Sequence, residues 1–173
     1  MTLLVTPAYV RTMAAYNAEM NRRLYQAAER IADVERRRDR GAFWGSLHGT
    51  LCHILWGDLI WMSRFDGWPK LAVPQKESAR LVTEFFELAR QRADTDARIE
   101  DWAGRVTDAW LAEELAWFSL SVQKEFRQPR SLLVAHLSNH QTHHRGQAHA
   151  LITACGEKTG DTDLFVVVPV PSA

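Results

Sequence analysis

Four long stretches of the sequence have the residue pattern of α-helices, and they limit the possible fold more than any other feature. The predicted helices cover about residues 7–35, 42–65, 78–104 and 130–154. Apolar side chains of the first recur at the helical period, whereas those of the second surround the helix, as in a buried helix. Helices of this length with modest connections predict an all-α fold, a four-helix bundle, formed by a single domain over residues 1–173.

Local signals mark where these helices begin and end. Thr6 followed by Pro7 is a typical helix start, and Pro129 and Gly156 flank the last predicted helix. The middle of the third helix, residues 91–98, is polar, and we expect it to face solvent.

Two segments break the helical pattern. Thr107 is expected to cap a short helix that reaches Leu115, and residues 117–122 alternate enough to predict a short strand or hairpin before the last long helix. The apolar run at 165–169 is expected to dock on the bundle or to pair with a partner.

The last predicted helix carries the segment that most suggests chemistry. His140, His143 and His144 lie within five residues of one another. Residues four apart share one helix face, so His140 and His144 can bind one metal ion, whereas His143 points about 100° away. Histidine pairs at this spacing also occur as buried residues that hydrogen-bond to carboxylates. The metal hypothesis therefore needs a further histidine on another helix.

His53 is the candidate for that third ligand, because it lies in an apolar part of the second predicted helix. A lone buried histidine is more often a hydrogen-bonded core residue than a ligand. Together with the pair on the last helix, it would complete a set of three imidazoles that leaves coordination positions open, as in catalytic zinc sites.

Other residues near the predicted ligands have more than one interpretation. Arg145 is expected to form an ion pair with Asp58 that fixes the register of two helices, or else to bind an anionic substrate. Gln147 is placed to hydrogen-bond metal-bound water or a ligand carboxylate. Asp58 and Glu125 are the acids considered for a general-base role. Gly146 is expected to permit close approach of two helices.

The remaining histidines and two tryptophans are assigned structural roles. His136 continues the stripe of the helical pair and is expected to support the site rather than to bind metal, because another ligand would close it. His48 and His149 lie on other helix faces. Trp56 and Trp61 are expected to lie in the core or in a pocket wall.

Composition argues against several classes of protein. The formal net charge is zero, with 21 basic and 21 acidic residues, which argues against a nucleic-acid-binding protein. Cys52 and Cys155 form no disulfide framework, which suits a reducing compartment. No stretch approaches the length of a membrane span, and the first residues do not resemble a signal peptide. We therefore expect a cytoplasmic protein.

Two motifs taken together resemble the DinB family of metalloenzymes, over nearly the whole chain. They are Leu51-x-His53-Ile54-Leu55-x-x-Asp58-x-x-Trp61-x-x-Arg64-Phe65 and Asn139-His140-Gln141-x-His143-His144-Arg145-Gly146-Gln147. The resemblance implies a four-helix bundle that is often dimeric. It also implies a divalent metal ion, zinc or nickel, whose ligands are His53, His140 and His144.

The resemblance further suggests an activity. Several members of the broader superfamily are thiol-dependent transferases or isomerases that use a metal-bound low-molecular-weight thiol. It therefore implies an S-transferase that acts on an electrophilic small molecule as a homodimer. The neutral charge and the lack of a membrane span predict neither nucleic-acid nor membrane partners. Alternatives are a metal-dependent hydrolase, a non-enzymatic metal-binding stress-response protein, and a helical scaffold with incidental histidines. The catalytic residues stay unknown, with Gln147, Asp58 and Arg145 as candidates.

Overall fold

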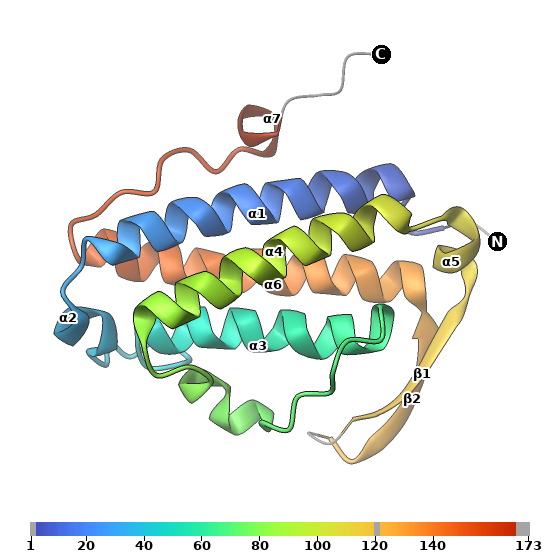
Figure 1. Ribbon diagram of the computed structural model, residues 1–173, viewed down its shortest axis with the longest axis horizontal. Helices are drawn as coiled ribbons and strands as arrows, with labels where there is room; N and C mark the ends of the chain where they lie inside the picture. Colours follow the sequence, from blue (N-terminus) through green and yellow to red (C-terminus); the bar gives the residue numbers. More distant parts are fainter. Residues whose placement is uncertain (1–2, 120–121, 169–173) are drawn as a thin grey trace.

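The computed structural model describes residues 3–119 and 122–168, and most of them are helical (Figure 1). In chain order the elements are α1 (Pro7–Glu29), α2 (Asp33–Arg37), α3 (Leu47–Phe65), the 3-10 helix η1 (Gln75–Arg80), α4 (Phe85–Arg105), α5 (Asp108–Ala112), β1 (Glu114–Ser119), β2 (Lys124–Pro129), α6 (Arg130–Ala154) and α7 (Leu164–Val167). The predicted all-α fold with a hairpin before the last long helix is confirmed.

The four long helices, α1, α3, α4 and α6, form the bundle (Figure 1). α1 packs mainly against α4 and α6, and α3 also packs against both α6 and α4. The first two long helices in the chain are therefore diagonal partners rather than neighbours. This arrangement makes α3 and α6 adjacent, and these are the helices that carry the predicted metal ligands.

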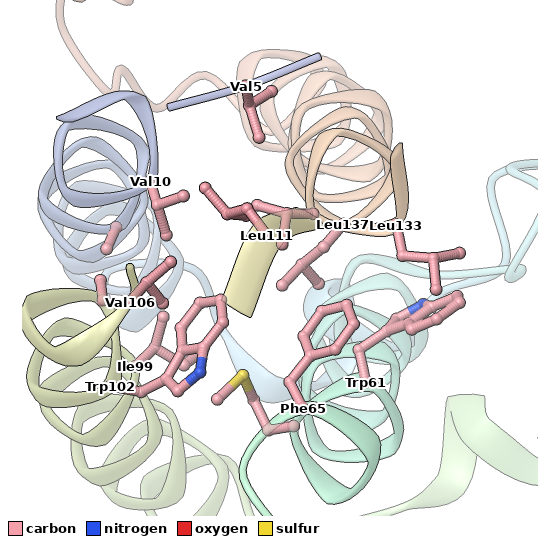
Figure 2. Close-up of a cluster of buried hydrophobic side chains, with 14 of the residues drawn as sticks. Val5, Val10, Trp61, Phe65, Ile99, Trp102, Val106, Leu111, Leu133 and Leu137 are labelled. Carbon is pink, nitrogen blue, oxygen red and sulfur yellow. The ribbon is translucent and has the colours of Figure 1, made fainter. Parts of the chain in front are cut away.

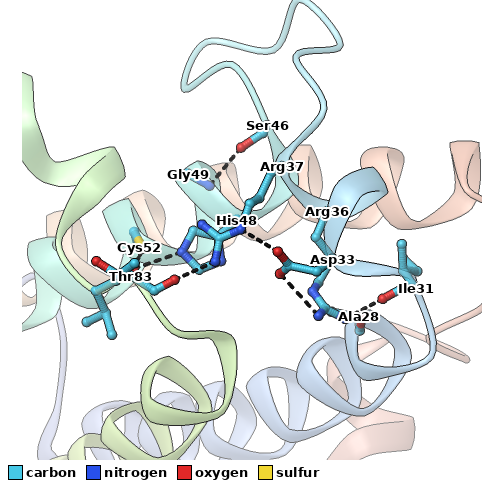
Figure 3. Close-up of polar contacts among 11 residues, drawn as sticks. Ala28, Ile31, Asp33, Arg36, Arg37, Ser46, His48, Gly49, Cys52 and Thr83 are labelled. Carbon is cyan, nitrogen blue, oxygen red and sulfur yellow. Dashed lines mark hydrogen bonds and ion pairs between the residues drawn. The ribbon is translucent and has the colours of Figure 1, made fainter.

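The boundaries of α6 agree with the prediction, whereas the first predicted helix is broken. α1 ends at Glu29, and a short α2 follows after a turn. The guanidinium of Arg36 reaches back and donates hydrogen bonds to the backbone carbonyls of Ala28 and Ile31 (Figure 3). This contact explains the break. These carbonyls at the end of α1 thereby gain a side-chain partner, and the chain turns away from the helix axis.

The second predicted helix begins later than expected, at Leu47 rather than at residue 42. Gly41 and Gly45 adopt positive φ angles of 71° and 74°, which form a tight turn that no helix can contain. The hydroxyl of Ser46 then caps α3 by accepting a hydrogen bond from the backbone N–H of Gly49 at 3.0 Å (Figure 3).

The third predicted helix, 78–104, is also interrupted, because residues 81–84 separate η1 from α4. The backbone carbonyl of Val82 in this break is hydrogen-bonded to Nε2 of His48 at 2.8 Å and so has a partner outside any helix. The end of η1 is thereby attached to α3. Ser78, near the predicted start of a long helix, instead lies fully buried within η1.

Two apolar clusters fill the bundle at different heights. One contains Trp61, Phe65, Trp102, Leu111 and Leu137 among others (Figure 2). The other includes Leu24, Leu51, Leu55, Leu88 and Ile152. On each long helix, the segment between the residues of the two clusters carries buried polar side chains. The interior therefore has a polar layer between two apolar ones.

This polar layer is a ring of contacts that joins all four long helices. Its members, in order, are Asn17 (α1), Gln141 (α6), Asp58 (α3), Arg92 and Asp96 (α4), and Asn21 (α1). Arg92 is only 2% exposed. The prediction that residues 91–98 face solvent is therefore wrong for Arg92, Thr95 and Asp96, which are buried. The charged groups of Arg92 and Asp96 find partners inside the bundle.

The hairpin and the tail complete the described fold. Strands β1 and β2 pair antiparallel, with Glu114 opposite Pro129 and Ser119 opposite Lys124. β1 begins before the predicted strand, and residues 120–121 lie outside the described range. The hydroxyl of Thr107 caps α5 as expected, by accepting a hydrogen bond from the backbone N–H of Trp110. The predicted end of this helix at Leu115 is wrong, because α5 ends at Ala112 and Leu115 pairs within β1.

The apolar segment near the C-terminus forms α7, which lies beside α1 (Figure 1). The hydroxyl of Tyr16 donates a hydrogen bond at 2.6 Å to the carbonyl of Thr162, which attaches this segment to the bundle. Phe165 is nonetheless 77% exposed, so docking on the bundle leaves its ring uncovered, and pairing of this run with a partner stays a prediction. Its last residue, 169, lies outside the described range. Within that range, none of the helices has the length and apolarity needed to cross a bilayer.

Candidate metal centre

Three histidines from the two adjacent helices α3 and α6 come together inside the bundle. One ligand nitrogen from each of His53, His140 and His144 lies within 4.8 Å of the other two. Nε2 of His53 is 3.1 Å from Nε2 of His140. The spacing of four residues places His140 and His144 on one face of α6, and the packing of α3 against that face supplies His53.

The spacing of these nitrogens fits a shared metal ion. Two nitrogen ligands at about 2.0–2.1 Å from a tetrahedral zinc ion lie about 3.3 Å apart. The distance of 3.1 Å between the Nε2 atoms of His53 and His140 is close to that value. His53 is 1% exposed and His144 is 8% exposed, so the donor atoms lie in the interior.

Burial also keeps these imidazoles in the neutral form that binds metal ions. Burial, together with mutual repulsion between the rings, lowers the pKa of His53 to about 3. The same causes lower the pKa of His140 to about 3. Burial lowers the pKa of His144 as well, although its hydrogen bond to Gln147 opposes the shift. At neutral pH all three rings therefore keep a lone pair available for a cation.

Two of the three rings, those of His53 and His144, are held by hydrogen bonds at Nδ1. Nδ1 of His144 lies 2.9 Å from Oε1 of Gln147. An amide oxygen only accepts, so Nδ1 carries the proton and Nε2 keeps its lone pair. Nδ1 of His53 is hydrogen-bonded to the buried hydroxyl of Ser78 at 2.8 Å. Such contacts fix ring orientation in protein metal sites.

Two tryptophans form aromatic walls beside His53. Its ring stacks on Trp44, with 3.8 Å between ring centroids, and also on Trp56, with 5.6 Å between centroids. The indole N–H of Trp56 donates a hydrogen bond at 2.7 Å to the carbonyl of Val73, which fixes the orientation of this wall. The indoles reduce the access of water to the cluster and strengthen electrostatic interactions within it.

Gly57 on α3 provides the space for the ring of His140. A Cβ at position 57 would lie 2.5 Å from Cε1 of His140, closer than carbon atoms can approach. Gly57 follows His53 by one helical turn, so the two residues face α6 together. Gly146, by contrast, has no atom within 4 Å of an added Cβ, so the prediction that it permits close helix packing is wrong.

The polar ring reaches the cluster through the residue that follows His140. The side-chain amide of Gln141 donates a hydrogen bond at 2.8 Å to Oδ1 of Asp58 on α3. Oδ2 of the same carboxylate accepts a hydrogen bond from Arg92 at 2.6 Å. Asp58 therefore connects α3 to α4 and α6 at the height of the cluster, and its carboxylate is fully buried.

The predicted ion pair between Arg145 and Asp58 is wrong, because Asp58 pairs with Arg92 instead. Arg145 donates a hydrogen bond to the hydroxyl of Thr142, and its guanidinium lies over the ring of Tyr16. Burial lowers the pKa of Arg145 to about 10. Arg145 is 5% exposed, which leaves it poorly placed to receive a substrate from solvent.

Of the two remaining candidates, Gln147 lies at the cluster and Glu125 does not. Gln147 is part of the centre, but it contacts His144 and His143 rather than a carboxylate. Glu125 is exposed on β2, outside the helical bundle. Of the predicted catalytic candidates, only Gln147 therefore touches a cluster histidine.

The other histidines occupy the positions that their helix faces predict. His136 packs edge-on against Trp61, with 5.1 Å between ring centroids, and its ring centroid is 6.2 Å from that of His140. His143 is exposed, and His48 is bound to the backbone of Val82. None of these histidines belongs to the cluster, which is formed by His53, His140 and His144 in the described residues.

Some residues of the centre were not identified from the sequence. Ser78 and Trp44 lie outside the long helices, and only the folded chain brings them to His53. Gly57 did carry a signal, since a glycine one turn after a buried histidine in an apolar helix indicates close approach of another group. The sequence around Arg92 is polar, and nothing in it indicates that this arginine is buried.

The fold and this cluster together define a class, namely helical bundles with a buried three-histidine centre formed by two adjacent helices. The DinB family model matches residues 4–167, nearly the whole chain, and the protein belongs to the DinB family. Comparison with curated proteins and with solved structures gave no match.

Proposed function

We propose that His53, His140 and His144 together bind one divalent cation, zinc or nickel, and that the protein is a metal-dependent enzyme. The observation that carries the proposal is the convergence of three neutral imidazole nitrogens within 4.8 Å of one another. Hydrogen bonds to Ser78 and Gln147 support two of these rings. Clusters of neutral histidines with such outer contacts are suited to zinc and nickel.

The number of ligands favours a catalytic role over a structural one. Structural zinc sites use four protein ligands, whereas catalytic sites use three and leave a position for water or substrate. In the described ranges, no cysteine or carboxylate joins the three histidines. A large apolar core also exists apart from the cluster, which supports a fold that does not depend on a cation.

Among metal-dependent reactions, we favour transfer of a low-molecular-weight thiol to an electrophilic small molecule. A divalent cation supplies Lewis acidity that lowers the pKa of a thiol or of water that reaches it. In the transfer, the thiolate sulfur forms a bond to the electrophilic carbon. The leaving group departs with the electron pair of its own bond, and the thiol proton goes to solvent. Trp44 and Trp56 limit competing water, and Gln147 holds the ring of His144.

A first experiment tests the metal site. The metal content of the purified protein is measured by elemental analysis, and zinc and nickel are titrated into the chelated protein. We expect one cation per chain in the wild type and loss of that cation in His53→Ala, His140→Ala and His144→Ala. His149→Ala is the matched control on α6, because His149 is hydrogen-bonded to Thr159 and lies outside the cluster. Unchanged metal content in the three variants would refute the proposed site.

A second experiment tests the reaction. The metal-loaded protein is mixed with a low-molecular-weight thiol and chlorodinitrobenzene, and the rate of thioether formation is compared with that of the chelated protein. Faster formation that is lost in His140→Ala supports the transferase. If only ester or amide hydrolysis depends on the metal, the protein is a hydrolase instead. If chelation unfolds the chain and neither reaction is seen, the cation is structural and the protein is a non-enzymatic metal-binding protein.

The association state and location are separate proposals. We propose a homodimer in the cytoplasm that acts on a small molecule and binds neither nucleic acid nor membranes. The zero net charge supports the exclusion of nucleic acid. Sedimentation equilibrium of the full chain tests the dimer, and a monomer at micromolar concentration would contradict it.

A further inference from the structure

A cavity of about 550 Å³ lies beside the histidine cluster. Its volume is in the range of small-molecule sites. Its walls come from α3, the segment after α3, the start of η1 and the end of β1. Its apolar lining includes Trp56, Ile60, Leu71, Val73, Pro74 and Phe118.

Two features place this cavity next to the cluster. Trp56 lines the cavity and also stacks on His53. η1 contributes Gln75 and Lys76 to the wall, and two residues later it provides Ser78, which is hydrogen-bonded to His53. A molecule in the cavity would therefore lie against Trp56, which stacks on His53.

The α3 wall follows one helix face away from the cluster. His53, Trp56, Ile60 and Arg64 are spaced so that they lie on the same side of α3. Trp56 and Arg64 are eight residues apart, which corresponds to about 12 Å along the helix axis. The cavity thus has an aromatic end close to His53 and a cationic end near Arg64.

Arg64 is a half-buried cation on α3. Its guanidinium lies 4.6 Å from the ring centroid of Trp61 and 5.6 Å from that of Trp117. In the part of the chain that the structure describes, no ion pair involves Arg64, and no acidic residue lines the cavity. Burial lowers the pKa of Arg64, which reflects the desolvation of its charge. Lys76 adds a second positive charge to the same lining.

A cation that is partly withdrawn from water without a counter-ion is stabilised further when an anion binds beside it. We propose that this cavity binds the substrate, and that the substrate is a small organic anion whose apolar part contacts Trp56 and whose acidic group binds Arg64 and Lys76. The inference rests on the proposed function, because it takes the histidine cluster as the reacting centre. It adds the chemical class of the substrate.

The test uses two fluorescent dyes with the same aromatic framework and the metal-loaded full chain. Anilinonaphthalenesulfonate carries a sulfonate, whereas N-phenylnaphthylamine is neutral. We expect the anionic dye to bind once per chain and more tightly than the neutral one. Arg64→Met should weaken binding of the anionic dye by about 10-fold and leave the neutral dye within about twofold. Arg64→Lys should restore part of the affinity.

Arg98→Met is the matched control. Arg98 lies 3.6 Å from the ring centroid of Trp68, so it also contacts an indole, but its surroundings include the acids Asp66 and Asp101 and not the proposed cavity. This variant should bind both dyes like the wild type. Ile60→Trp fills the cavity and should weaken binding of both dyes.

Two results would overturn the proposal. One is equal affinity of the wild type for both dyes, and the other is wild-type binding of both dyes to Ile60→Trp. If Arg64→Met does not fold, Lys76→Met takes its place, because Lys76 is exposed and its loss should weaken only the anionic dye. A wrong assignment of the metal site would instead be seen in the elemental analysis of the histidine variants. The two failures are therefore distinguishable.

Discussion

Gly57→Ala tests whether α3 must approach α6 this closely for the histidine cluster to form. The new Cβ would lie 2.5 Å from Cε1, 3.1 Å from Nδ1 and 3.4 Å from Nε2 of His140. Carbon atoms in contact prefer about 3.5–4.0 Å, so the ring has to move by about 1 Å. Metal–nitrogen distances tolerate only about 0.2 Å. We therefore expect this substitution to withdraw His140 from metal binding.

Stability and metal affinity should respond by different amounts to Gly57→Ala. Alanine is favoured over glycine within a helix by about 0.5–1 kcal/mol, whereas overpacking a filled interior costs about 1–3 kcal/mol. The metal-free variant should thus lose about 2.5 kcal/mol of unfolding free energy or less. Changes around ligands reduce metal affinity by about 10–100-fold, so displacement of a ligand itself should exceed about 100-fold.

The assay combines urea unfolding in the presence of a chelator with a competition titration of zinc against a chromophoric chelator. Gly146→Ala is the control, because it lies on α6 close to the cluster and an added Cβ there meets nothing within 4 Å. The unfolding free energy of Gly146→Ala should rise by about 0.5–1 kcal/mol, and its zinc affinity should stay unchanged. If Gly57→Ala gained the same stability and bound zinc as tightly as the wild type, the reasoning about helix approach would be refuted.

Three further predictions concern the contacts around the cluster. Ser78→Ala should weaken zinc binding by about 10–100-fold in the competition titration, because it frees the ring of His53. Arg92→Met should lower the unfolding free energy, measured with urea, by about 3–5 kcal/mol, because it leaves the buried carboxylates of Asp58 and Asp96 without a counter-ion. Burial raises the pKa of Asp96 to about 6, so the folded chain holds a proton that the unfolded chain releases. The unfolding free energy should therefore fall as pH rises from about 4 to about 6, and Asp96→Asn should lack this loss in parallel urea titrations.

The sequence predicted those parts of the fold that depend on neighbouring residues. Pro129 and Gly156 delimit α6 because a missing N–H and a positive φ act within a single turn. The pairing of His140 with His144 follows from helix geometry alone. His53 was chosen as their partner because it lies in an apolar part of the second predicted helix, which does not by itself distinguish a ligand from a core histidine. The family motifs then supported that choice.

The errors arose where distant residues decide the local structure. α1 stops early because Arg36 binds the carbonyls of Ala28 and Ile31, and a periodic pattern does not report such a contact. Arg92 is buried because Asp58 on another helix receives its charge. A polar residue with a partner inside and one that faces solvent look alike in a single sequence.

The polar ring and the histidine cluster depend on the same helix register. Gln141 bonds to Asp58 across the α3–α6 interface, and the preceding residue, His140, meets His53 across that interface. A shift of α6 by one turn would separate both pairs and leave buried polar groups without partners, which costs about 1–3 kcal/mol for each group. The packing that avoids this cost therefore brings the three histidines together without a cation. We expect a centre organised in this way by the fold to need no metal to hold the bundle together, so chelation should remove the proposed activity without unfolding the chain.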